Sequence, residues 1–154
     1  MPIHIRLTVD DRHGVLDRIT GLIRRNGLNI SEINAGAKGD GTSHISIRTK
    51  DKGADIDVLR KGLAQLECVR TLEECTGETH YSREVLLFSV RRSDCREGMF
   101  PGAQLMEQAG SLMILAYMAS PDDIDALLAD HKDLICDYSR GGALAIKKEG
   151  VEDK

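Results

Sequence analysis

The sequence predicts an α+β fold made of two consecutive modules, of which the second is a shortened copy of the first. Two observations support this prediction. Apolar residues alternate with a period of two over residues 3–9 and then change to a helical period from Val15. A polar, glycine-containing segment at 77–82 then separates this first part from a second series of apolar runs. We therefore assign residues 1–76 to the first module, 77–82 to a linker and 83–154 to the second module.

The first module begins with a strand at residues 3–9, because the alternation indicates one buried face. Residues 15–23 place their apolar side chains on one helical stripe, and Asn26-Gly27 is typical of a helix C-terminus. Residues 28–35 return to an extended pattern. Their alternation shifts after Ser31, which predicts a β-bulge.

The remainder of the first module repeats this arrangement. Gly39-Asp40-Gly41 predicts a turn, and residues 43–49 form the strand that follows it. An amphipathic helix is expected at 56–66, preceded by acidic residues that suit its N-terminus, and a strand closes the module at 69–76. The order strand, helix, strand, strand, helix, strand is the ferredoxin-like plan, in which both helices cover one face of the sheet.

The second module keeps only part of this order. Apolar strands are expected at 85–90 and 112–118, and Pro121 suits the first turn of a following helix. The expected first helix is missing or reduced, since Pro101-Gly102 interrupts that region. The segment Ala103–Ala109 is compatible with a short helix or with a strand paired to 112–118, and we favour the strand.

Two further extended segments, 134–138 and 143–147, are separated by Gly141-Gly142 and complete the second module.

Composition excludes several classes of protein. With 41% hydrophobic residues the chain can bury a core, whereas a net charge of −4 argues against a surface that follows nucleic-acid phosphates. Aromatic residues are only 3%, so stacking platforms for single strands are scarce. The longest apolar run, Leu112–Ala119, is too short to span a bilayer, and the N-terminus does not resemble a signal peptide. We expect a soluble cytoplasmic protein that binds neither nucleic acid nor membrane.

Cysteine and histidine spacing gives no metal signature. The four cysteines include no C-x-x-C pair, and the five histidines supply no close ligand pairs. We therefore expect reduced thiols and no metal site.

The corner between the first strand and the first helix is a candidate binding site. The first turn of a helix offers unpaired N–H groups and a partial positive charge, both of which suit a carboxylate. Gly14 has no side chain, so a ligand can approach the N–H groups of Gly14, Val15 and Leu16. Asp11 and Asn29, expected at the same edge of the sheet, would then face an α-ammonium group. This combination predicts a site for a free amino acid. The alternative is a helix cap, a turn and a loop amide with no ligand.

A resemblance to a known family is carried by the pattern Asp11-x-x-Gly14-Val15-Leu16-x-x-Ile19-x-x-Leu22-Ile23-x-x-x-Gly27-x-Asn29-Ile30. This pattern resembles the opening of an ACT domain, a small amino-acid-sensing module. More narrowly, the chain is similar to the regulatory (small) subunit of acetohydroxyacid synthase, also called acetolactate synthase. The segments HYSREVLLFSV and SRGGALAIKKEG resemble the opening and the end of that family's second domain. The resemblance covers nearly the whole chain and is strongest over residues 1–50.

The resemblance implies tandem ACT-type modules in a subunit with no catalysis of its own. Such a subunit docks on the catalytic large subunit, raises its activity and relays feedback inhibition by a branched-chain amino acid, with valine as the first candidate. Its N-terminal modules pair as a homodimer or higher homo-oligomer, with the effector between them. No cofactor is expected on this chain, because thiamine diphosphate, Mg and FAD would belong to the catalytic subunit.

Carried over by position, the effector site would comprise Asp11, Gly14, Val15, Leu16, Asn29, Ile30 and Gly36. Leu16 and Ile30 would form an apolar wall, and Gly36 would face the partner module. The family more often has asparagine where Asp11 stands, and an aspartate would favour the ammonium of a ligand but repel its carboxylate.

Two other functions stay open. The chain could be a stand-alone ACT sensor that regulates a different enzyme or a transcription factor. An enzyme is a third alternative, but the sequence contains no nucleophile elbow, metal cluster or phosphate loop at the required spacing, so we expect no catalytic residues.

Overall fold

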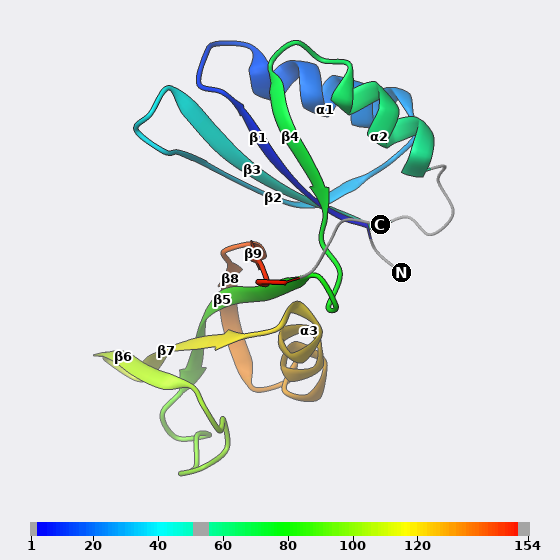
Figure 1. The fold of residues 1–154 in the computed structure, drawn as a ribbon. Helices are drawn as coiled ribbons and strands as arrows, with labels where there is room; N and C mark the ends of the chain where they lie inside the picture. Colours follow the sequence, from blue (N-terminus) through cyan, green and yellow to red (C-terminus); the bar gives the residue numbers. More distant parts are fainter. Residues whose placement is uncertain (1–2, 51–55, 151–154) are drawn as a thin grey trace. The chain divides into compact units, whose positions relative to one another are not determined.

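The computed structural model describes residues 3–50 and 56–150. These residues divide into two compact units, shown in Figure 1. The first unit comprises the described residues up to Tyr81 together with those from Leu144, and the second comprises Ser82–Ala143. The C-terminal segment thus groups with the first unit, whereas the sequence assigned it to the second module.

The first unit has the predicted ferredoxin-like order. Its elements are β1 (His4–Asp10), α1 (Val15–Arg25), β2 (Ile30–Ala37), β3 (Thr42–Thr49), α2 (Ile56–Ala64) and β4 (Val69–Glu74). The sheet order is β2-β3-β1-β4 with every neighbouring pair antiparallel. Both helices lie on one face of this sheet (Figure 1). The α+β class and the ACT-like plan are therefore confirmed.

The core of the first unit lies between the sheet and its helices. The alternating apolar residues of β1 and β3 meet apolar stripes of α1 and α2, and each fully buried aliphatic side chain of this kind contributes about 1.5–3 kcal/mol. The most deeply buried members include Ile5, Leu7, Ile19, Ile23, Ile47, Leu59 and Leu63. The pairing of β2 with β3 shifts register between Ile30 and Glu32, which confirms the bulge predicted near Ser31.

The second unit has one helix and a sheet in which four strands lie side by side. Its elements are β5 (His80–Arg91), β6 (Gln104–Ala109), β7 (Leu112–Ala119), α3 (Pro121–Asp130) and β8 (Ile135–Arg140). The strand order is β6-β7-β5-β8, and β9 (Leu144–Lys147) also pairs with β5. The preference for a strand before Gly110 is confirmed by the antiparallel pairing of β6 with β7. Because β5 begins at His80, the predicted linker at 77–82 is partly strand.

A loop at 92–103 replaces the first helix of the second unit. Phe100 is 7% exposed and packs edge-to-face on Phe88, with ring centroids 5.1 Å apart. Its other neighbour is His131, at 4.8 Å between ring centroids. One aromatic side chain therefore fills core space that a helix would otherwise occupy.

Candidate functional site

The N-terminus of α1 is open. Gly14 is its N-cap residue, with φ +78 and no side-chain capping hydrogen bond. The first amide to bond back into the helix is that of Arg18, whose N–H donates to the carbonyl oxygen of Gly14 at 3.1 Å. The N–H groups of Val15 and Leu16 come before this first intrahelical hydrogen bond, so they have no acceptor within the helix. A Cβ added at Gly14 would have no heavy atom within 4 Å, so a ligand has space to reach these amides.

The predicted residues around this N-terminus differ in what they can offer. Val15 is buried in the core, so it can contribute only its backbone, whereas the Leu16 side chain is 45% exposed. Asp11 is exposed, and its N–H donates to the carbonyl oxygen of Gly41 at 2.9 Å. This bond ties the corner to the turn between β2 and β3 and leaves the Asp11 carboxylate at the surface.

Asn29 does not lie beside this corner within one chain. Asp10 pairs with Thr42 at the start of β3, whereas Ile30 pairs with Thr49 at its end. Seven strand residues separate these positions, which corresponds to roughly 23 Å. The expectation that residues 11, 14 and 29 share one edge is therefore wrong for a single chain. The reason is that α1 returns the chain to the opposite end of the sheet before β2 begins.

Asn29 and Ile30 instead line a hollow beside α1. The hollow has a volume of about 340 Å³, and its other lining residues are Asp17, Thr20, Gly21, Arg24 and Leu28. The four α1 residues follow the spacing i, i+3, i+4, i+7 and so share one helix face. Asp17 and Arg24 bring opposite charges to this hollow, while Leu28 and Ile30 are apolar.

Four of these lining residues were not predicted from the sequence: Asp17, Thr20, Gly21 and Arg24. No sequence signal distinguishes them, because polar residues opposite an apolar stripe are typical of the solvent-exposed face of an amphipathic helix.

Strand β2 is the edge of the first sheet, so one of its sides has no neighbouring strand among the described residues. Ile33 on this strand is 40% exposed. A Cβ at Gly36 would lie 2.8 Å from Cε1 of His44, so the His44 side chain would have to shift to accept one. Gly36 thus lies against a side chain of its own chain, and its predicted role towards a partner module stays a prediction.

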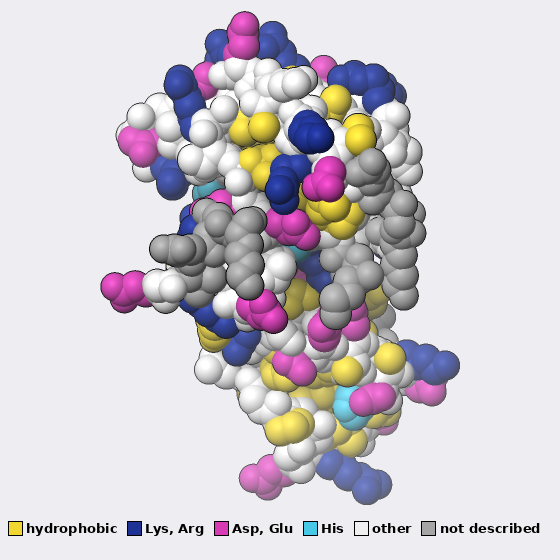
Figure 2. Space-filling model, turned by 45° about the vertical axis from the view of Figure 1, so that its right-hand side comes forward, with side chains coloured by type: hydrophobic (Ala, Val, Ile, Leu, Met, Phe, Trp, Pro, Cys, Tyr) yellow, Lys and Arg dark blue, Asp and Glu magenta, His cyan; other side chains and the backbone are white. Residues whose placement is uncertain are grey.

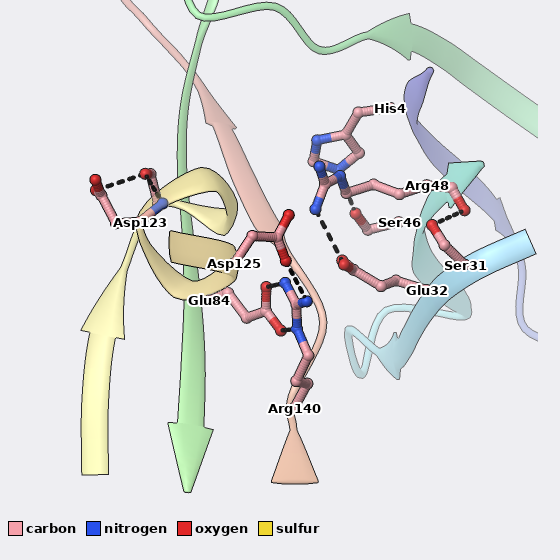
Figure 3. Close-up of polar contacts among 10 residues, drawn as sticks. His4, Ser31, Glu32, Ser46, Arg48, Glu84, Asp123, Asp125 and Arg140 are labelled. Carbon is pink, nitrogen blue, oxygen red and sulfur yellow. Dashed lines mark hydrogen bonds and ion pairs between the residues drawn. The ribbon is translucent and has the colours of Figure 1, made fainter. Parts of the chain in front are cut away.

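The polar face of the first sheet contains a compact network (Figure 3). His4 Nε2 and Ser46 Oγ share a hydrogen bond of 2.7 Å, and the Arg48 guanidinium donates to Glu32 at 3.0 Å. Burial lowers the pKa of His4 to about 4, with further lowering by the charges of Arg48 and His80. A neutral His4 and a paired Arg48 indicate a structural network.

A second polar cluster lies within the second unit (Figure 3). Arg140 donates to both carboxylate oxygens of Glu84 at 2.7 Å and also bonds to Asp125. Glu84 is only 1% exposed, so this bidentate pair neutralises a buried charge that joins β5 to β8.

The described residues carry neither a metal cluster nor a membrane helix. Across residues 3–50 and 56–150, no three His, Cys, Asp or Glu side chains are grouped so that they could hold a metal ion. Within the same residues no helix is long and apolar enough to cross a membrane. Acidic and basic side chains are interspersed over the face drawn in Figure 2. The four cysteines are free thiols, and burial raises the pKa of Cys75 to about 12.

Comparison with known proteins gives a consistent result. Residues 5–71 match the family described as the AHAS small subunit-like ACT domain. The acetolactate synthase isozyme 3 small subunit of Salmonella typhimurium is 25% identical over 94% of this chain and 94% of that protein. The corresponding Escherichia coli protein is 23% identical over the same shares. The Bacillus subtilis acetolactate synthase small subunit is 35% identical over 56% of this chain and 51% of that protein.

The fold agrees with this relationship. The crystal structure of the acetolactate synthase small subunit from Thermotoga maritima superposes with a TM-score of 0.81 and 20% identity, covering 98% of this chain and 99% of that chain. The fold is therefore shared along both units. The matched ACT domain covers residues 5–71, and the relatives aligned over 94% of the chain are 23% and 25% identical, so the chain is similar along its length to acetolactate synthase small subunits.

Proposed function

We propose that two copies of this chain bind a branched-chain amino acid, valine in the first place, between their N-terminal units. The observation that carries this proposal is the open N-terminus of α1 at Gly14, together with a separate hollow at Asn29. The helix N-terminus would bind the carboxylate of the amino acid, and Asn29 would contact its ammonium group, so each feature is half of a site for a zwitterion. Because they lie at opposite ends of one sheet, a complete site requires two copies.

Antiparallel pairing of two β2 edge strands would bring the halves together. In such a pair, the end of β2 that carries Ile30 in one copy lies beside the end that carries Ala37 in the other. Ala37 pairs with Ser43 at the start of β3, which is also the end where β1 reaches Asp11. Asn29 of one copy then lies at the same end as Asp11 and Gly14 of the second copy.

The chemistry of the two halves suits an aliphatic amino acid. The amides of residues 14–16 and the helix dipole attract the carboxylate, and Asp11 with the Asn29 side chain offers acceptors to the ammonium group. Leu16 and Ile30 provide apolar contact for the aliphatic side chain. Such contact discriminates one methylene by about 1–3 kcal/mol, which is enough to separate valine from leucine and isoleucine.

Regulation follows by linkage. An amino acid that binds one arrangement of the paired units more tightly shifts the equilibrium towards that arrangement, and a partner that senses the arrangement must alter amino-acid affinity in return. The partner is the catalytic large subunit of acetolactate synthase, in the cytoplasm. Thiamine diphosphate, Mg and FAD belong to that subunit, and this chain contributes no catalytic residue.

The site is tested by Gly14→Asp, with Gly14→Asn as its matched control. Asparagine and aspartate tolerate the left-handed backbone similarly and differ mainly in charge. We expect calorimetry to show valine affinity at least tenfold weaker for the aspartate than for the asparagine variant, because a second carboxylate would occupy the amides. Equal affinities would contradict the placement of the ligand carboxylate.

The partner is tested by adding the purified protein to an acetolactate synthase large subunit. We expect higher synthase activity, and inhibition of that activity when valine is added. If valine binds but no synthase responds, the chain is an amino-acid sensor for another protein. The same assay without the large subunit should show no turnover.

A further inference from the structure

The second unit contains a cleft between the loop at 92–103 and the β6–β7 hairpin. Its volume is about 710 Å³. The cleft opens on the sheet face that α3 covers, because Leu115 and Met113 on its floor pair with the core residues Phe88 and Val90. In the ferredoxin-like plan, a helix between the first two strands would cover this half of the face. Here the loop leaves it partly open, and every residue of β6 is exposed.

The floor and the wall of the cleft are mainly apolar. On the hairpin, Leu105 pairs with Leu115 and Gln108 pairs with Met113, so these four side chains share one face. On the loop, Met99 and the buried Phe100 face the same space. Methionines adapt to ligands of different shape because the thioether chain is flexible and polarisable.

The charged residues at the rim of the cleft carry a net positive charge. Arg92 and Arg96 both line it and are both exposed, while Glu97 is the one acidic residue among the lining residues. Neither arginine takes part in an ion pair with any described residue. A guanidinium binds carboxylates through a planar set of donors, so two such groups beside an apolar floor favour a ligand with an anionic head and a hydrocarbon chain.

The size of the cleft suits a small molecule. Its volume lies within the range of roughly 300–1,000 Å³ typical of small-ligand pockets. We propose that this cleft binds an aliphatic carboxylate, with its head on Arg92 and Arg96 and its chain over Met99, Met113 and Leu115. This site is distinct from the amino-acid site proposed for the first unit.

The test uses the full-length protein with its methionine methyl groups labelled with carbon-13, and potassium octanoate as the probe. We expect saturable shifts of the Met99 and Met113 signals. Met118 is 67% exposed on the opposite sheet face, where it pairs with Val85, so its signal should not move and serves as an internal control. Parallel movement of the Met118 signal would indicate unspecific detergent binding and would overturn the proposal.

Two variants and one matched control test the head-group contact. R92Q/R96Q should weaken octanoate binding at least tenfold, and Gln108→Glu should weaken it because a carboxylate then faces the ligand. Arg91→Gln should leave it unchanged, since Arg91 pairs with Leu112 on the opposite sheet face. Unchanged affinity in R92Q/R96Q, or an equal loss in Arg91→Gln, would contradict the assignment.

Ligands that differ in chain length and in charge show which part of the bound molecule the cleft recognises. Hexanoate should bind more weakly than octanoate because it buries less apolar area, and uncharged octanol should bind more weakly than octanoate because it lacks the anionic head. If inorganic phosphate shifts Met99 and Met113 as strongly as octanoate does, the cleft is a simple anion site and the aliphatic part of the proposal fails. None of these outcomes depends on valine binding by the first unit.

Discussion

At the scale of single residues, His4 links protonation to the stability of the first unit. Its ring is buried on the sheet face that also holds Arg48, and its pKa is lowered to about 4 by burial first and by Arg48 and His80 next. In the unfolded chain the same ring titrates near its ordinary value of 6.5. The unfolded state therefore binds more protons between these two pH values, and stability rises with pH across this window.

We therefore predict that the free energy of unfolding falls as the pH is lowered from about 6.5 to about 4. The contribution of His4 is at most roughly 3 kcal/mol, because its pKa is lowered from 6.5 to about 4 and one pKa unit corresponds to about 1.4 kcal/mol. Urea unfolding at several pH values checks this, with His4→Gln as the control that cannot titrate but can still bond to Ser46. Identical pH slopes in both proteins would contradict the role assigned to His4.

Other single residues show what the sequence can and cannot predict. Gly14 was predictable, because a glycine between a strand and an amphipathic stripe favours an open helix N-terminus. The position of Asn29 also follows from the predicted strand-helix-strand order, because the crossover helix returns the chain to the end of the sheet where the first strand began, and the sequence prediction overlooked this consequence. Asp17 and Arg24 were overlooked because their face of α1 reads as ordinary solvent-exposed surface.

At the scale of secondary-structure elements, Arg140 joins β8 to β5 and α3 through one guanidinium. It bonds both oxygens of the fully buried Glu84, and hydrogen bonding to Glu84 raises the pKa of Arg140 above its ordinary value. Removing one partner of a buried pair leaves an uncompensated charge, which typically costs about 3–5 kcal/mol.

We predict that Arg140→Met lowers the free energy of unfolding by about 3 kcal/mol or more, measured by urea denaturation. Asp125→Asn should cost less than about 1 kcal/mol, because the Asp125 side chain is 58% exposed. Adding Glu84→Gln to Arg140→Met should restore part of the loss, since no charge then stays buried. Equal effects of Arg140→Met and Asp125→Asn would show that burial of Glu84 is not the cause.

The elements themselves were largely predictable from periodicity and turn residues. The register shift of β2 and the pairing of β6 with β7 follow from local alternation and from the Gly110-Ser111 turn. The grouping of β9 with the first unit could not be predicted, because β9 pairs with β5 and a four-residue strand contains no pattern that indicates any other association. Phe100 filling the place of a helix was likewise not visible, since a single aromatic residue has no periodicity.

At the scale of the whole molecule, the proposed function makes the amino-acid site depend on the pairing of two copies. If β2 pairs with β2 of a second copy, the edge residue Ile33 becomes buried, and Asn29 meets Asp11 and Gly14 of that copy. We predict that Ile33→Lys gives a monomer in sedimentation equilibrium and loses valine binding in calorimetry, because a lysine at the edge opposes strand pairing. Val58→Lys makes the same chemical change at an exposed position of α2 and should alter neither property. A monomeric Ile33→Lys protein that still binds valine would place the whole effector site within one chain, whereas a dimeric one would show that the copies associate through another surface.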